Sequence, residues 1–316
     1  MYLILAIILG SAARMVGQGF LLNGAGYTSP APVPVAPCQL TTFYTGLPSS
    51  ADLGATAGAV PLPLSLAGIS AQALVGSLRL DVPELTVFSV ELGGVSSFAN
   101  IGYRETALTV QIPCELPIFA GQIYTLVVVG STPNAAAIYL YLSPDAIHII
   151  RKGDTLTNPS QGVYLSPHFL PPAITHADGS SVTPDNPAKV GEAVAIWAVG
   201  LGLPSSGTVK SGAANPSPPL TTTVNVDFEF RPNAGPSMPW PPPGSSITAA
   251  PGDSHIPAIA VPAYFAPGYV GLYQVNVTIP KPPVPLQACG GVFQSNVTVN
   301  IGGMASFDGA GICVSQ

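Results

Sequence analysis

Charged residues are scarce in this sequence. Only 24 of 316 residues are charged, 9 basic and 15 acidic, whereas about 25% of an average soluble protein is charged. The formal net charge of −6 offers no basic surface to neutralise phosphates, which argues against a nucleic-acid partner. The same shortage leaves few groups for acid–base work or metal binding, so we expect no catalytic residue, no metal site and no cofactor.

Long apolar runs are also missing. No stretch reaches the roughly 18 apolar residues of a transmembrane helix, which predicts no transmembrane span. A shorter run, Tyr2–Leu9, precedes small residues up to Ala13 and is typical of a signal-peptide core and its cleavage site. No Lys or Arg precedes the run, and the alternative is a buried first strand. Residues 1–18 are therefore a signal peptide or an apolar N-terminal strand, and we expect a secreted or cell-surface protein.

The sequence also lacks segments that would form helices. The chain holds 34 glycines and 36 prolines, too many prolines for a helical protein, while a hydrophobic share of 47% is too high for a disordered chain. The glycines have no period of three, which excludes collagen. The nearest approach to an amphipathic helix is Ala71–Leu80, and Gly76 weakens it.

Strand-like segments recur along the chain instead, each bounded by turn-forming residues. They are Leu85–Leu92, Ala107–Ile112, Ile123–Val129, Ala137–Leu142, Ala193–Val199, Thr222–Phe230, Leu272–Ile279 and Val292–Ile301. Many short strands separated by turns are typical of β-sandwiches. The length predicts two domains, residues 19–168 and 169–316, joined by a stiff Pro-rich link near His168–Pro172. Similar strands that end in proline, Ala107–Pro113 and Tyr273–Pro280, suggest that the two sandwiches are related.

The four cysteines, Cys38, Cys114, Cys289 and Cys313, fall two in each half. Three disulfide connectivities are possible. None of the cysteines forms a CxxC pair and none has a histidine at zinc-ligand spacing, so disulfides within each half are favoured over a zinc site. Such bonds form in oxidising compartments. Four buried free thiols are the alternative.

The second half resembles a known family. Ala263–Pro280 (AYFAPGYVGLYQVNVTIP), together with Asn186–Ala188 and Ala198–Gly202, looks like an uncharacterised Ig-like C-terminal domain family of exported Solibacter-type acidobacterial proteins. In the first half, Pro61–Gly68 and Thr109–Pro113 are similar to its upstream repeat. The resemblance implies two tandem immunoglobulin-like β-sandwich domains in a bacterial protein, and it carries over no catalytic residue.

One departure from the family pattern is a Pro-rich insertion, residues 231–257. Trp240, Pro241 and Pro242 offer an apolar surface for stacking a protein or glycan partner, and a stiff cover over a sheet edge is the alternative. Tyr264 and Tyr269 belong to an aromatic cluster that suits a carbohydrate platform or, as the alternative, core and corner packing. These five residues are the candidate contact surface.

Motifs for chemistry are few. His176 and Asp178 suggest a metal or acid–base pair, but Asp178-Gly179 is ordinary turn chemistry. Asn276-Val-Thr and Asn296-Val-Thr match the glycosylation pattern, yet both lie in expected strands and we interpret them as strand residues.

The sequence therefore favours a non-catalytic, extracellular protein that acts in adhesion, docking or spacing. Its expected partners are a protein or glycan at the cell surface, self-association included. The second hypothesis is a subunit of a homopolymeric filament, in which Tyr2–Leu9 completes the sheet of a neighbour. A hydrolase is kept as the third.

Overall fold

The computed structural model is all-β over the residues that it describes. These are residues 21–23, 27–29, 33–45, 54–91, 104–130, 135–151, 171–204, 207–230, 255–283, 285–286, 295–301 and 307–315. No helix occurs among them, which confirms the expected all-β class. None of these segments forms a helix that could span a membrane.

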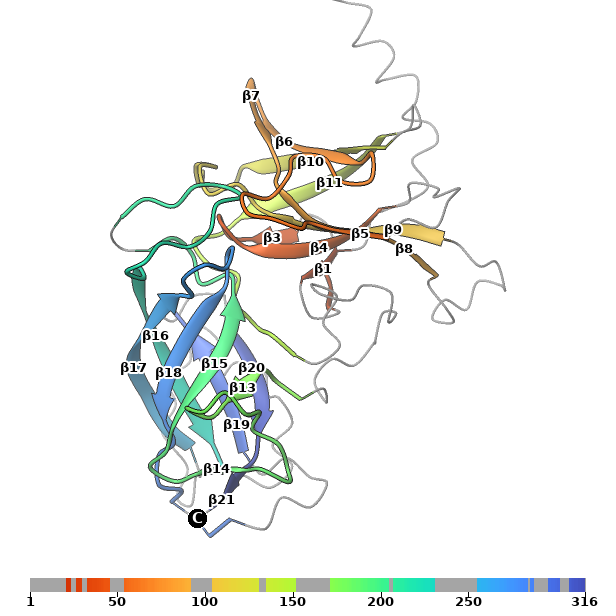
Figure 1. Ribbon diagram of the computed structural model, residues 1–316. Helices are drawn as coiled ribbons and strands as arrows, with labels where there is room; N and C mark the ends of the chain where they lie inside the picture. The colour runs from red at the N-terminus through yellow and green to blue at the C-terminus, as the bar shows by residue number, and fades with distance from the viewer. Residues whose placement is uncertain are drawn as a thin grey trace, which may run out of the picture.

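Two sheets make up the N-terminal unit, at the top of Figure 1. Sheet 1 has the order β2 (Tyr27–Ser29), β1 (Leu21–Asn23), β4 (Leu40–Thr45), β9 (Arg104–Gln111), β8 (Glu84–Glu91) and β5 (Gly54–Thr56). Sheet 2 has the order β3 (Val33–Val35), β11 (Ala135–Leu142), β10 (Ile123–Val129), β6 (Ser70–Val75) and β7 (Leu78–Asp81). All neighbours in these orders are antiparallel except β3 and β11.

The two sheets share one core. Phe43, Val87 and Leu108 of sheet 1 belong to the same buried cluster as Tyr124 and Leu126 of sheet 2. Along β10 buried residues alternate with exposed or half-buried ones, as expected for a strand with one face toward a core. The N-terminal unit is therefore a sandwich of two sheets.

The C-terminal unit is built on an eight-stranded sheet, sheet 3. Its order is β12 (His148–Ile149), β15 (Ala193–Val199), β18 (Tyr273–Thr278), β17 (His255–Phe265), β16 (Thr221–Glu229), β19 (Ser295–Asn300) and β20 (Phe307–Ile312), with β13 (Ile174–Thr175) also paired to β15. A separate parallel pair is formed by β14 (Ala188–Lys189) and β21 (Val314–Ser315).

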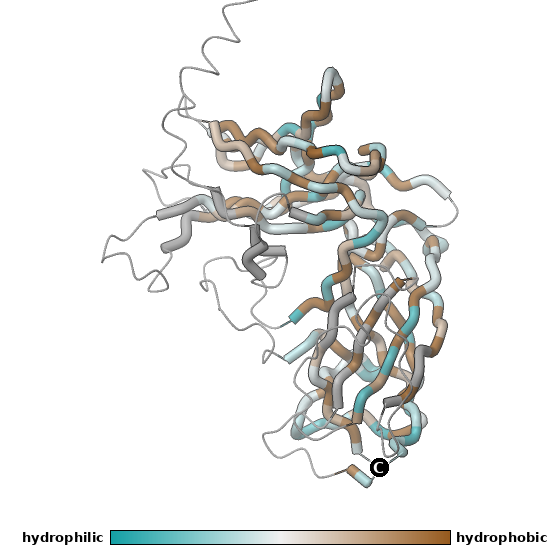
Figure 2. Tube along the Cα trace, turned by 180° about the vertical axis from the view of Figure 1, so that it is seen from behind, coloured by the Kyte–Doolittle hydropathy of each residue, from teal (hydrophilic) through white to brown (hydrophobic). Residues whose placement is uncertain are grey.

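Sheet 3 curls around its core. β12, at one end of the strand order, contacts β20 at the other end, and Figure 1 shows β19 and β20 behind β15–β18. The inward residues are apolar, among them Ile196, Phe228 and Val275. Figure 2 shows apolar and polar residues alternating along the strands of both units.

All eight expected strands are present, with ends that differ by up to three residues. The segment Ala71–Leu80 is a hairpin: β6 and β7 flank Gly76 and Ser77, and Gly76 has a φ of 54°. Because a positive φ is easy for glycine, the residue that weakened the helix interpretation forms the turn.

The division of the chain at residue 168 stays a prediction. β12 lies on the N-terminal side of that position and pairs with β15 beyond it. Residues 1–18, and residues 231–254 of the Pro-rich insertion, lie outside the described residues.

Candidate functional site

A disulfide lies where the two units meet. Cys38 and Cys114 are bonded, with their Cα atoms 4.3 Å apart, and the bond closes a sequence separation of 76 residues. Both cysteines come from the N-terminal unit, yet they pack in the buried cluster of the C-terminal unit with Ile147 and Ile149. The expected disulfide is confirmed, and although it lies within the N-terminal unit it packs into the core of the C-terminal unit. Cys313 is disulfide-bonded as well, and its expected partner Cys289 lies outside the described residues.

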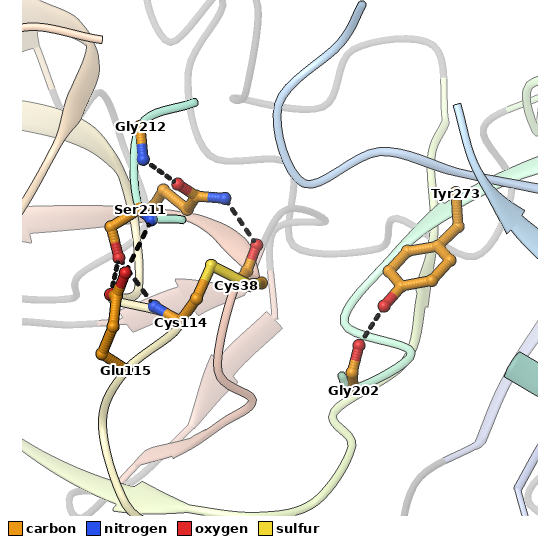
Figure 3. Close-up of a disulfide and its surroundings, with 8 residues drawn as sticks. Cys38, Cys114, Glu115, Gly202, Ser211, Gly212 and Tyr273 are labelled. Atoms are coloured by element: carbon orange, nitrogen blue, oxygen red, sulfur yellow. Dashed lines mark hydrogen bonds between the residues drawn. A yellow bond between two sulfur atoms is a disulfide. The ribbon is translucent and has the colours of Figure 1, made fainter. Parts of the chain in front are cut away.

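The loop between β15 and β16 holds the units together beside this disulfide (Figure 3). The Ser211 hydroxyl accepts a hydrogen bond of 2.8 Å from the Cys114 N–H and donates to the Glu115 carboxylate. The Gly212 N–H donates to Oε1 of Gln111 at 2.6 Å, and Nε2 of Gln111 donates to the Cys38 carbonyl at 3.2 Å. We call these contacts the clasp.

Glu115 is charged in this setting. Partial burial by itself raises the pKa of the Glu115 carboxyl, but the hydrogen bonds from Ser211 and the nearby Lys210 ammonium outweigh it and bring the pKa below its ordinary value. The clasp therefore includes charge-assisted hydrogen bonds, which are stronger than neutral ones.

A close backbone contact lies next to the clasp. Gly271, in the loop before β18, has a φ of 60°, and a Cβ placed on it would lie 2.5 Å from the Cys38 carbonyl oxygen. A side chain at this position would force the units apart or distort both. Gly271 thus permits a close approach of the two backbones beside the clasp.

An apolar cleft of about 430 Å³ opens at the same junction. Its lining residues are Leu40, Ala57, Gly58, Ala59, Val60, Leu62, Leu85, Ile150, Gly268, Tyr269, Val270 and Leu272. Leu40 and Leu85 come from the N-terminal unit and pack with Ile150 and Leu272 of the C-terminal unit. Pockets for small ligands commonly have volumes from about 300 to 1,000 Å³ and are mostly apolar, so this cleft has the size and character of a binding site.

The rim of the cleft is exposed. Tyr269 is 59% exposed and Val60 is 45% exposed. Tyr269 lies in a loop that Asn215 fixes: the Asn215 N–H donates to the Tyr269 carbonyl at 2.6 Å, and its side-chain amide donates to the carbonyls of Ala266 and Leu272 at 3.0 Å each. The ring is thus presented by an anchored loop, as a contact residue requires.

Of the other residues of the expected contact surface, only one lies among the described residues. Tyr264 is half-buried on β17, opposite Gln274 of β18. Trp240, Pro241 and Pro242 lie outside the described residues. The aromatic cluster in the sequence also includes Phe265 and Tyr273, which are buried with ring centroids 4.1 Å apart. These two rings pack in the core, whereas Tyr269 is strongly exposed.

His176 and Asp178 lie in a turn. The Asp178 carboxylate accepts hydrogen bonds from the N–H and the hydroxyl of Ser180, at 2.9 and 2.7 Å, and Gly179 has a φ of 84°. Nδ1 of His176 lies 2.5 Å from the Glu192 carboxylate, a contact that links β13 to the segment before β15. Among the described residues, no three His, Cys, Asp or Glu side chains are grouped as a metal site would need.

Sequence reasoning missed the clasp and the cleft. Ser211, Gly212 and Gln111 match no motif, and the two halves of the cleft are far apart in the chain. Two glycines beside aromatic residues, Gly268 and Gly271, are the one local signal of a close approach. No protein-family model matches this sequence, and no curated protein matches it. The immunoglobulin-like resemblance therefore stays a prediction.

Proposed function

We propose that this chain is an exported, non-catalytic protein of two immunoglobulin-like domains that acts by contact in adhesion, docking or spacing at a bacterial cell surface. The observation that carries the proposal is the open apolar cleft with the exposed Tyr269 on its rim. The Cys38–Cys114 disulfide supports export, because such bonds persist in oxidising compartments. The all-β fold and the resemblance of Ala263–Pro280 support the domain type.

The cleft is the contact site in this proposal. Its walls belong to both units, and the disulfide and the clasp fix their separation. A preformed apolar site avoids the entropic cost of ordering loops on binding. An aromatic anchor that fills a pocket is typical of the residues that dominate binding energy, and Tyr269 presents such a ring to a protein or glycan partner.

Retention of the labelled full chain on bacterial cells, glycan arrays and extracellular matrix tests the proposal. We expect the wild type to bind at least one of these surfaces, and Tyr269→Ala and Val60→Asp to reduce retention about tenfold or more, as hot-spot changes do. Tyr139→Ala is the matched control, because Tyr139 is 46% exposed on a distant strand, β11.

Two results would overturn the proposal: no retention of the wild type on any surface, or equal retention of the wild type and both rim variants. The filament hypothesis rests on Tyr2–Leu9, which lies outside the described residues, and it stays an alternative.

A further inference from the structure

The strand β7 is an edge strand of sheet 2 in the described part of the chain. Among the described strands, β7 pairs only with β6, at the end of sheet 2. The β6–β7 hairpin projects beyond the rest of the sheet at the top of Figure 1. Unpaired backbone groups on such an edge are a template for another strand.

The hairpin register shows which groups face outward. Val75 pairs with Leu78 across the two-residue turn, so these two form a hydrogen-bonded pair and the bonded pairs recur at every second residue. The hydrogen bond from the Val82 N–H to the Ala71 carbonyl, 3.0 Å, continues the pattern. The N–H and C=O groups of Arg79 and Asp81 therefore point away from β6, to the open edge.

The side chains of β7 alternate. Leu78 and Leu80 pack against the core of the sandwich, whereas Arg79 and Asp81 are exposed on the outer face of sheet 2. Asp81 already accepts a hydrogen bond of 2.8 Å from the amide of Gln72, and a carboxylate has room for further donors.

Charge selects one way to extend this edge. If a second β7 pairs antiparallel with its two-fold axis at Leu80, Arg79 of each copy lies directly opposite Asp81 of the other. A shift by two residues in one direction would place Arg79 opposite Arg79, and in the other direction Asp81 opposite Asp81. Opposite charges across strands stabilise and like charges destabilise, so the sequence favours the symmetric register alone.

We propose that β7 is a self-association edge: two copies of this chain pair their β7 strands antiparallel about Leu80, and their second sheets join into one. The Arg79 and Asp81 backbones supply the hydrogen bonds, and two Arg79–Asp81 pairs fix the register. Pro83, which has no N–H, ends the pairing. Because the contact uses the same surface of both copies, it closes as a dimer rather than a fibre.

The competing interpretation is that a short, charged edge prevents pairing. Charge-reversal variants distinguish this interpretation from the proposed dimer. Sedimentation equilibrium of the full chain should show a concentration-dependent dimer in the weak range typical of small interfaces. Arg79→Asp or Asp81→Arg makes both cross-strand pairs repulsive and should weaken dimerisation about tenfold or more. The double variant Arg79→Asp/Asp81→Arg restores both pairs and should restore the dimer.

Two further variants complete the test. Lys281→Asp makes the same change in net charge as Arg79→Asp, on an exposed residue of the C-terminal unit, and should leave dimerisation unchanged. Asp81→Pro removes an outward N–H, a substitution that edge strands tolerate, and should abolish the dimer while the circular dichroism spectrum stays the same.

The proposal is overturned if the wild type is monomeric up to about 1 mM, the range of very weak complexes. It is equally overturned if either single reversal dimerises as the wild type does, or if the double variant stays monomeric. None of these results depends on the cleft, whose variants leave β7 unchanged.

Discussion

The two units bury different kinds of side chain. Eight polar or charged residues are buried in the N-terminal unit: Gln39, Thr41, Thr42, Glu84, Thr86, Thr106, Thr109 and Gln111. In the C-terminal unit, counted from β12 over the described positions, the buried polar or charged residues are His148, Arg151, Asn215 and Glu229. The N-terminal unit thus buries more polar side chains, and polar atoms of Thr41, Glu84 and Thr86 have no hydrogen-bond partner among the described residues. This difference predicts that the N-terminal unit is the weaker of the two.

The chain offers a way to observe the units separately. Its two tryptophans are Trp197 and Trp240, both in the C-terminal half, so fluorescence reports on that half. Far-ultraviolet circular dichroism reports on all strands. Coincidence of the two signals during urea unfolding is the test of a single cooperative transition.

The largest effect on the free energy of unfolding is expected from removing the disulfide at the junction. Cys38→Ala/Cys114→Ala removes a covalent link over a separation of 76 residues, which should lower the free energy of unfolding by about 4 kcal/mol. We expect the circular dichroism transition to move to lower urea than the fluorescence transition, because the bond constrains the unfolded chain of the N-terminal unit, to which both cysteines belong.

Val182→Ala is the control for this change. Val182 is buried in the C-terminal core and its N–H donates to the carbonyl of Ile174 on β13, so its truncation should shift the fluorescence midpoint at least as far as the circular dichroism midpoint. Coincident transitions in the cysteine variant would contradict a weaker N-terminal unit.

The second effect comes from Glu84, a carboxyl group in the N-terminal unit. Glu84 is fully buried, and neither carboxyl oxygen has a hydrogen-bond partner among the described residues. Burial raises the pKa of Glu84 from 4.5 to about 8. Between these values the folded state keeps a proton that the unfolded state has released, so stability falls as pH rises, by up to about 1.4 kcal/mol per pH unit. Glu84→Gln should remove this slope. Between pH 5 and 7 the free energy of unfolding of the variant should therefore rise by about 2 kcal/mol relative to that of the wild type.

Glu115 provides a matched control of opposite sign. The hydrogen bonds of the clasp lower the pKa of the Glu115 carboxyl. The contribution of Glu115 to the free energy of unfolding is therefore present above the ordinary pKa and is lost as pH falls through the lowered value. Glu115→Gln should therefore leave the slope between pH 5 and 7 unchanged. A Glu84→Gln variant with the wild-type slope would show that Glu84 is ionised in the folded state.

Local pattern was sufficient to predict the strands but not the junction. The period of two in Ile123–Val129 and Ala193–Val199 places both strands with the observed ends, because alternation records which face is buried. β17 was not predicted, since its prolines at 257 and 262 argue against a strand by local propensity.

The candidate site could be predicted only in part. Tyr269 and the Cys38–Cys114 bond were among the expected residues, because ring chemistry and cysteine spacing are visible in the sequence. The docking of the two units determines two further features. The disulfide packs in the core of the other unit, and Leu40 and Leu272 line one cleft. No local pattern encodes such docking.

The third effect compares one buried tyrosine in each unit. The hydroxyl of Tyr273 donates to the Gly202 carbonyl in a buried hydrogen bond, and the hydroxyl of Tyr124 donates to the Pro117 carbonyl in a part-buried one. Tyr273→Phe leaves a carbonyl that water cannot reach and should cost about 2 kcal/mol, whereas Tyr124→Phe should cost about 1 kcal/mol because water can replace the hydroxyl. Urea midpoints of the two variants check the order, and equal costs would contradict it.

The smallest effect concerns His176, on the surface of the C-terminal unit. Its hydrogen bond with Glu192 raises the pKa of the imidazole, although partial burial opposes the shift. The stability that it contributes is fully present below the unfolded pKa near 6.5 and is lost as pH rises through the higher folded pKa. His176→Gln should cost about 0.5 kcal/mol at pH 6, because ion pairs close to the surface are weak, and almost nothing at pH 9. Fluorescence should detect this loss of stability in the C-terminal unit, whereas circular dichroism follows the pH dependence of stability that Glu84 causes in the N-terminal unit. If Glu192→Gln does not lower the pKa of His176 in an NMR titration, the pair does not form in solution, and the pH response of the C-terminal unit has another origin.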